Sequence, residues 1–191
     1  MSKDIIKQNF SEAHTLLTQF IADPNNFSLI EEAGRVLVTG FKNGNKVISC
    51  GNGGSMCDAM HFAEEFSGRF RDDRKPFPAL AISDASHITC VGNDYGFEKI
   101  FSRFIDAAGN KGDVLLAIST SGNSKNVIEA ARSAKAKGMK VIGLLGKDGG
   151  QLLDLCDVAI VAPFSKYADR AQEIHIKVIH SLIHYVELNS K

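Results

Sequence analysis

The 191-residue sequence has no excess of charge, because 22 lysines and arginines balance 22 aspartates and glutamates. A chain without a basic or acidic excess has no electrostatic preference for nucleic acid or for an anionic membrane surface. It also has no apolar run near the roughly 18 residues that a membrane-spanning helix requires. We therefore expect neither nucleic acid nor a membrane among its partners.

Cysteine is scarce, and its spacing does not indicate disulfides or a thiolate metal site. The four cysteines, at positions 50, 57, 90 and 156, include no C-x-x-C pair. The first 24 residues mix charged side chains with apolar ones, which is not the pattern of a secretory signal peptide. We therefore expect a cytoplasmic protein whose thiols are free and buried.

Linkers, fixed-period repeats and low-complexity tracts are also absent, so we expect a single domain over residues 1–191. Apolar residues recur at helical spacing over 3–22 and again over 27–43, and turn residues follow each stretch. Residues 1–45 are therefore predicted to form a pair of amphipathic helices, which either cover a sheet or pair with helices of another subunit. Residues 46–191 are predicted to form an α/β core with a long C-terminal helix.

The core region alternates short apolar runs with helical stretches. Five runs are predicted strands: 46–50, 78–83, 113–119, 140–146 and 157–162. Strands that are apolar on both faces and separated by helices form parallel sheets covered on both sides. The predicted fold class is therefore α/β, with a five-stranded parallel sheet flanked by helices, the last of them over 168–189.

Two loops that follow predicted strands join small or hydroxyl side chains to the start of a helix. The segment 51–55 (GNGGS) follows the first strand, and 119–124 (STSGNS) follows the third. Ligands bind beyond the carboxyl ends of parallel strands, and the free N–H groups at a helix N-terminus attract anions. Either loop alone is equally well explained as a turn with a helix cap, but the two together indicate an anion site.

Neither loop is a nucleotide fingerprint, since the sequence has no G-x-x-x-x-G-K-[ST] and GNGGS is not G-x-G-x-x-G. The hydroxyl-rich segment suits the terminal phosphate of a small molecule. The helix after the first loop places His61 and Glu65 one turn apart on one face, with Glu64 turned toward water. Such a pair is common on solvated helices, but apolar neighbours and the upstream loop favour a functional role. Imidazole and carboxylate at this spacing make two zinc ligands.

The last predicted helix carries three of the six histidines, His175, His180 and His184, beside an apolar stripe. A histidine near such a stripe is more often a core residue than a ligand. Spacing alone favours His180 with His184 and does not decide which of the three serves a site.

The segments GNGGS, HFAEE, VGND, LAISTSGNS and ADRAQEIHIKVIH together resemble the phosphoheptose isomerases, a branch of the sugar isomerase (SIS) domain family. The resemblance covers essentially the whole chain. It implies a flavodoxin-like three-layer sandwich whose N-terminal helices take part in the contacts of a homotetramer. It also implies conversion of sedoheptulose 7-phosphate to D-glycero-D-manno-heptose 7-phosphate through an enediol, toward the heptose of lipopolysaccharide.

The same resemblance implies roles for individual residues. Glu65 and His180 correspond to the acid/base pair. The ligands of the family's zinc ion, one per subunit, correspond to His61, Glu65, Gln172 and His180. The residues that correspond to substrate contacts are Asn52, Gly53, Gly54, Ser55, Glu65, Arg69, Asn93, Asp94, Ser119, Thr120, Ser121, Ser124, Asp169 and Gln172, with the hydroxyls of 119–124 on the phosphate.

Helix geometry adds an expectation about assembly. Gln172 and His180 lie eight residues apart, roughly 12 Å along a helix axis, so one metal ion reaches both from one helix only with stretched side chains. We therefore predict that the site involves more than one subunit.

Two other functions stay open. One is a non-catalytic SIS protein that binds a sugar phosphate or associates with the replication initiator; the other is an isomerase of a pentose or hexose phosphate. The presence of both Glu65 and His180 favours an enzyme.

Overall fold

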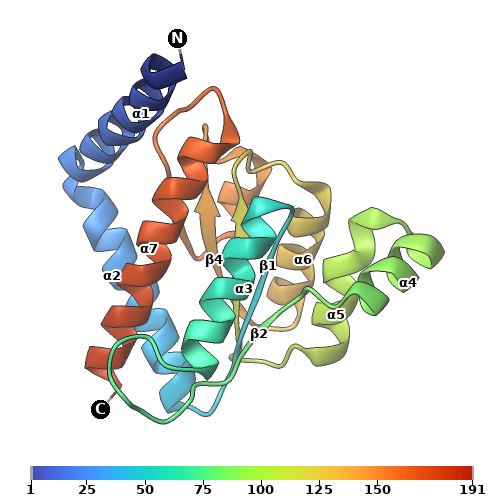
Figure 1. The fold of residues 1–191 in the computed structure, drawn as a ribbon. Helices are drawn as coiled ribbons and strands as arrows, with labels where there is room; N and C mark the ends of the chain where they lie inside the picture. The colour runs from blue at the N-terminus through green and yellow to red at the C-terminus, as the bar shows by residue number, and fades with distance from the viewer. Residues whose placement is uncertain (1, 191) are drawn as a thin grey trace.

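A computed structural model describes residues 2–190 and arranges them as a sheet covered by helices on both faces (Figure 1). The helices are α1 (Ser2–Ala22), α2 (Pro24–Lys42), α3 (Gly54–Ser67), α4 (Ala85–Tyr95), α5 (Ile100–Ala108), α6 (Lys125–Ala136) and α7 (Ala168–Asn189), with 3-10 turns η1 (Phe97–Lys99) and η2 (Gly150–Leu155). The strands are β1 (Val47–Gly51), β2 (Ala79–Ala81), β3 (Val114–Ser119), β4 (Lys140–Leu145) and β5 (Val158–Val161).

The five strands form one sheet in the order β2-β1-β3-β4-β5, and every neighbouring pair is parallel. This order is the flavodoxin-like one, with a switch point between β1 and β3. The predicted α/β class is thus confirmed. The edge strand β2 is shorter than the predicted 78–83, because it pairs only with Val47–Ser49 of β1.

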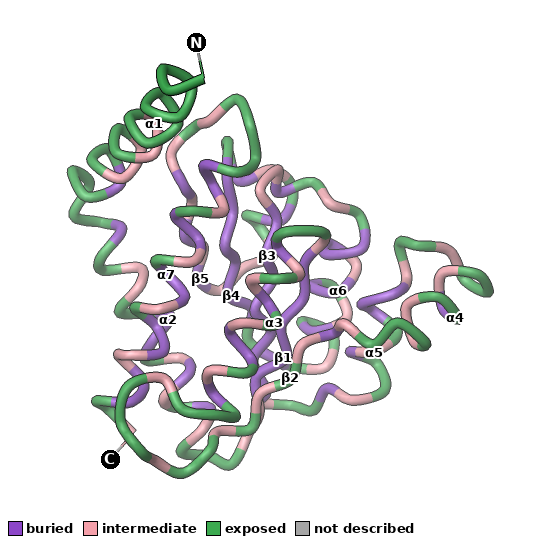
Figure 2. The backbone as a smooth tube through the Cα atoms, viewed as in Figure 1, coloured by how far each residue is buried: buried purple, intermediate pink, exposed green. Residues whose placement is uncertain are grey.

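Two apolar cores lie on the two faces of the sheet. One holds Phe62 and Phe66 of α3 against Val178 and Leu182 of α7, together with α2. The other packs α5 and α6 on the opposite face, around Phe101. Figure 2 shows β1, β3 and β4 as almost continuously buried, whereas the edge strand β2 is only partly buried. The two helices that carry the predicted site residues, α3 and α7, therefore share one face and pack on each other.

The helices at 85–95 and 100–108 have no counterpart in the sequence predictions. Helix α4 buries only Val91, so its apolar pattern is weak. Its start is nevertheless marked by Asp84, whose carboxylate accepts a hydrogen bond from the His87 amide at 2.8 Å. The predicted helix at 27–43 begins earlier, at Pro24, because Asp23 caps it and proline is favoured in a first helical turn.

The thiols are free, as expected, but only that of Cys50 is fully buried, and Cys156 is half-buried. Cys57 and Cys90 lie exposed on helices α3 and α4, so the expectation of burial is wrong for these two. Burial raises the pKa of the Cys50 thiol to about 12. The spacing of the cysteines argued against disulfides but did not show which helix face each one occupies.

Helix α1 leaves the body of the molecule and packs mainly on α7 (Figure 1). Only Phe20 of α1 is buried, whereas Ile5, Ile6 and Phe10 are 59%, 56% and 75% exposed. Between residues 2 and 190, no helix combines the length and the apolar character needed to cross a bilayer.

Candidate active site

The hydroxyl-rich segment forms the turn between β3 and α6. Ser119 ends the strand, and its Oγ lies 2.9 Å from Oγ of Ser124, the residue that precedes α6. Ser124 makes no side-chain cap hydrogen bond, so the explanation of this serine as a simple helix cap does not hold. The Ser121 hydroxyl accepts a hydrogen bond from the Asn123 amide at 3.1 Å. The turn thus presents several hydroxyls at the positive end of a helix.

The GNGGS turn lies directly beside it. Asn52 and Asn126 exchange two side-chain hydrogen bonds, of 2.9 Å and 2.8 Å, which join the first turn to the start of α6. Gly53 has φ +54°, a conformation that favours glycine. Asn52, Ser124 and Asn126 line a pocket of about 460 Å³. The structure therefore brings together the two loops that the sequence singled out.

A second hollow, of about 240 Å³, lies on the other side of the hydroxyl turn. Thr120 and Ser121 line it together with Lys147. A larger pocket, of about 640 Å³, lies between α2 and the beginnings of β3 and β4 and includes none of the predicted site residues. Polar chemistry, and not pocket size, therefore identifies the candidate site.

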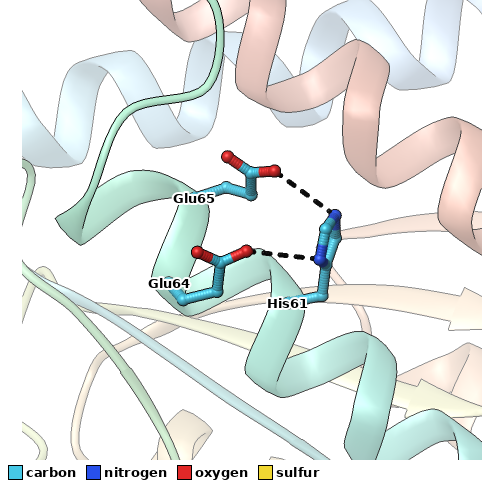
Figure 3. A group of neighbouring side chains, drawn as sticks. All are labelled: His61, Glu64 and Glu65. Atoms are coloured by element: carbon cyan, nitrogen blue, oxygen red, sulfur yellow. Dashed lines mark ion pairs between the residues drawn. The ribbon is translucent and has the colours of Figure 1, made fainter.

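His61 is the centre of a cluster of possible metal ligands on α3 (Figure 3). Its Nε2 lies 3.5 Å from Oε1 of Glu65, and its Nδ1 lies 3.3 Å from Oε1 of Glu64. From α7, the Nε2 atom of His180 approaches the same Nε2 of His61 to 3.0 Å. Glu64 is exposed, as predicted, but its contact with the histidine ring was not anticipated.

These separations fit a tetrahedral zinc ion. With zinc–nitrogen and zinc–oxygen bonds of about 2.0–2.2 Å, neighbouring ligand atoms lie about 3.3 Å apart. The Nε2–Nε2 and Nε2–Oε1 separations of 3.0 Å and 3.5 Å bracket that value. Two imidazole nitrogens and a carboxylate oxygen are also a donor set that zinc accepts. His61, Glu65 and His180 are therefore placed to hold such an ion.

Helix α7 gives its three histidines three different environments. His175 is buried, and its ring Nε2 donates to the Leu145 carbonyl at 2.7 Å. His180 faces α3, and the His184 ring lies 3.3 Å from a guanidinium nitrogen of Arg71. Burial lowers the pKa of His175 to about 4. The pairing of His180 with His184, which spacing alone favoured, is replaced by a pairing of His180 with His61.

Burial shifts the pKa of both members of the predicted acid/base pair in the direction that favours the uncharged form. Desolvation raises the pKa of Glu65, and the negative charges of Glu64 and Glu187 add to this effect. Desolvation lowers the pKa of His180, and His61 adds to that effect. A carboxylate with a raised pKa beside an imidazole with a lowered one is a typical acid/base arrangement.

Gln172 lies apart from this cluster within the chain. A Cβ at Gly54 would overlap the Gln172 amide, so that amide lies against the first turn of α3. His61 lies seven residues further along α3, about 10 Å along the axis. Among residues 2–190, no hydrogen bond joins Gln172 to His61 or to His180. Gln172 thus borders the GNGGS turn and not the histidines.

Four other predicted residues are exposed and lie on different elements. Arg69 follows α3, and Asp169 lies in the first turn of α7. On α4, the Asn93 amide donates to the Asp94 carboxylate at 2.8 Å. Helix α4 lies at the right edge of Figure 1, away from α3 and α7. The structure of one chain therefore does not bring Asn93 and Asp94 to the His61 cluster.

Comparison with known proteins agrees with this geometry. The parallel sheet and the hydroxyl turn define an SIS-domain protein, and the SIS domain family model matches residues 8–146. The chain is 59% identical to the phosphoheptose isomerase of Haemophilus ducreyi, over 95% of this chain and 94% of that protein. It is 58% identical to that of Shigella dysenteriae, over 98% and 97%.

A solved structure gives the same result. The phosphoheptose isomerase from Neisseria gonorrhoeae superimposes with a TM-score of 0.92 at 35% identity, covering 98% of this chain and 100% of that one. The chain therefore belongs to the phosphoheptose isomerase family of SIS-domain proteins.

Proposed function

We propose that this chain interconverts sedoheptulose 7-phosphate and D-glycero-D-manno-heptose 7-phosphate, toward the heptose of lipopolysaccharide. The observation that carries the proposal is the 59% identity, over 95% of the chain, to a protein named phosphoheptose isomerase. The hydroxyl turn and the histidine–glutamate cluster of the structure agree with that reaction. The whole of residues 1–191 would act as one SIS domain in the cytoplasm, where free thiols such as those of Cys57 and Cys90 persist.

The substrate phosphate would bind at the hydroxyl turn, to Ser119, Thr120, Ser121 and Ser124. Backbone N–H groups and the dipole of α6 favour a dianion there. The sugar would extend along the GNGGS turn, Asn52–Ser55, toward Gln172 and Asp169 at the start of α7. The contact of the Gln172 amide with Gly54 supports this path.

The reaction moves one proton between neighbouring carbons. A base removes a proton from carbon 1 of the ketose, an enediol forms, and the proton returns to carbon 2, which becomes the carbon next to the aldehyde. We assign the carbon-bound proton to Glu65 and the oxygen-bound protons to His180. The raised pKa of Glu65 supports its role as a group that takes up and returns a proton, and the lowered pKa of His180 favours the neutral imidazole, which can both accept and donate one.

We further propose that His61, Glu65 and His180, together with Gln172, hold one zinc ion per subunit. When bound, zinc supplies positive charge that stabilises the oxyanion of the enediol. The donor separations around His61 support the assignment for three of these residues.

A homotetramer with sites shared between subunits would complete the arrangement. Within one chain, Gln172 lies at the start of α3, against Gly54, whereas His180 lies against His61 in the middle of that helix. Asn93 and Asp94 lie on the outlying helix α4. The exposed apolar side chains of α1, such as Phe10, supply a surface for contacts between subunits.

The test is to incubate the purified protein with sedoheptulose 7-phosphate, with and without a chelator, and to detect the aldose. We expect conversion that the chelator reduces and that added zinc restores. Binding of the sugar phosphate without conversion would favour a non-catalytic SIS protein. Faster conversion of a pentose or hexose phosphate would favour an isomerase of that substrate.

A further inference from the structure

Arg74 joins the end of α3 to α7 by hydrogen bonds to both. Its Nη2 donates to the main-chain carbonyl of Glu65 at 2.6 Å, and its Nη1 donates to that of Phe66 at 2.8 Å. Its Nε donates to the Glu187 carboxylate of α7 at 2.8 Å. The two side chains are only 13% and 8% exposed. One guanidinium therefore fixes the two helices that carry the candidate site.

The chemistry of a helix end explains why arginine suits this position. The last carbonyls of α3 have no partner within the helix. A cation there is favourable because it faces the negative end of the helix dipole. Arginine offers five donors in a planar fork, so it bonds two carbonyls and a carboxylate at once, which the single ammonium of lysine does not match.

The segment 68–77, which Arg74 anchors, also contacts the catalytic face of α7. The Phe70 ring lies 5.5 Å from the His180 ring, centroid to centroid. Arg74 also stacks on Phe77, 4.8 Å from the ring centroid, and so holds the end of the segment. Figure 1 shows this segment as the loop that follows α3 and curves past the C-terminal end of α7.

Glu65 and His180 lie on different helices, so their relative position depends on how α3 is held against α7. Proton transfer and metal binding demand a placement within about 0.5 Å. We propose that Arg74 is a positioning residue: it fixes the Glu65 end of α3 against α7 and, through the segment 68–77, fixes the ring of His180. The inference rests on the proposed isomerase and its zinc site.

The test compares Arg74→Lys with the parent protein, because lysine keeps the charge but not the fork. We expect kcat for sedoheptulose 7-phosphate to fall at least about tenfold, with KM changed less than about threefold. Zinc binding to the metal-stripped protein, measured by calorimetric titration, is expected to weaken about tenfold. Glu187→Gln, which leaves Arg74 in place, is expected to show the same losses to a smaller degree.

A buried ion pair far from the site supplies the control. Lys46→Met breaks the pair of Lys46 with Asp113 at the other end of the sheet, so it is expected to lower the melting temperature without changing kcat or zinc affinity. Parental kcat and zinc affinity in Arg74→Lys, or equal losses in Lys46→Met, would overturn the proposal. If Arg74→Lys does not fold, Glu187→Gln decides by the same criteria. If the parent lacks isomerase activity, the proposed function fails, and the zinc titration still tests Arg74.

Discussion

Polar side chains at the two ends of the sheet have different kinds of hydrogen-bond partner. At the amino ends of the strands, Asp113 accepts hydrogen bonds from the Lys46 amide at 3.0 Å and from the Asn110 amide at 2.8 Å, and it pairs with the Lys46 ammonium at 2.5 Å. Asp157 accepts from the Val141 amide at 2.8 Å. Each carboxylate there joins neighbouring segments, and both of its oxygens have partners.

At the carboxyl ends, neutral polar groups bond mainly to one another. Ser119 pairs with Ser124, and Asn52 pairs with Asn126. Hydroxyls and amides of this kind retain unused donors and acceptors. Under the proposed function, the comparison assigns stability to one end of the sheet, and binding and catalysis to the other end with the adjoining α3–α7 contact. Substitutions at the two ends should therefore change different quantities.

The largest effect is expected for Glu65→Gln, which removes a titratable group but keeps the shape of the side chain. Loss of a general acid/base reduces the rate by about 10²–10⁴-fold. We expect kcat to fall within that range, while the melting temperature, compared between the metal-stripped proteins, stays at or above that of the parent, since a partly buried charge disappears. The measurement is steady-state kinetics with thermal unfolding on the same sample; unchanged turnover would refute the role of Glu65.

The next effect is expected for Asp113→Asn, which leaves the mostly buried Lys46 ammonium without its partner. Breaking a buried ion pair costs about 3 kcal/mol. We expect the free energy of unfolding, measured in urea, to fall by about that amount, with kcat and KM per folded molecule unchanged. As the matched control, Lys140→Met removes an exposed ammonium that pairs with Asp157 at 3.0 Å, and it is expected to cost less than about 1 kcal/mol. A fall in kcat for Asp113→Asn would break the distinction between the two ends.

A smaller effect is expected for Ser124→Ala at the hydroxyl turn. Hydrogen bonds to a charged phosphate contribute about 1.5–3 kcal/mol, so KM for the sugar phosphate should rise roughly 10–100-fold, with kcat less affected. Ser181→Ala, which removes a hydroxyl bonded only to the Lys177 carbonyl on α7, is the matched control. Equal KM values for the two variants would argue against a phosphate site at Ser124.

The smallest effect concerns His175, whose pKa is lowered by burial from 6.5 to about 4. Between these pH values the unfolded chain binds a proton and the folded chain does not, so the stability from His175 is full above pH 6.5 and is lost as the pH falls toward 4. We expect the free energy of unfolding to drop by about 1 kcal/mol more between pH 7 and 5.5 in the parent than in His175→Gln. Identical pH dependence in both would contradict the buried, neutral state.

The sequence was sufficient for the class of fold and for the position of both loops. Strands such as 114–119 are apolar on both faces, which only a covered parallel sheet explains, and each loop follows a strand directly. Spacing alone did not choose among His175, His180 and His184, although the resemblance implied His180. That choice depends on the packing of α7 against α3 and β4, which brings His61 and Leu145 to different faces of one helix.

Arg74 and the helix α4 escaped prediction for related reasons. Arg74 lies nine residues beyond Glu65 in an irregular segment, and its hydrogen bonds to a main-chain carbonyl and to Glu187 have no periodic signature. Helix α4 has little apolar surface, although the cap at Asp84 was a usable signal. Local patterns predict elements, whereas contacts between distant segments decide the site.

The central claim is that Glu65 moves a proton between neighbouring carbons of a phosphorylated heptose, and turnover in D₂O tests it most directly. NMR of the product of sedoheptulose 7-phosphate should show deuterium at carbon 2 of the aldose, because the proton held by Glu65 exchanges with solvent before it returns. Aldose formed at the normal rate without deuterium at that carbon, by the parent and by Glu65→Gln alike, would contradict the account, because hydrogen would then reach carbon 2 without this carboxylate.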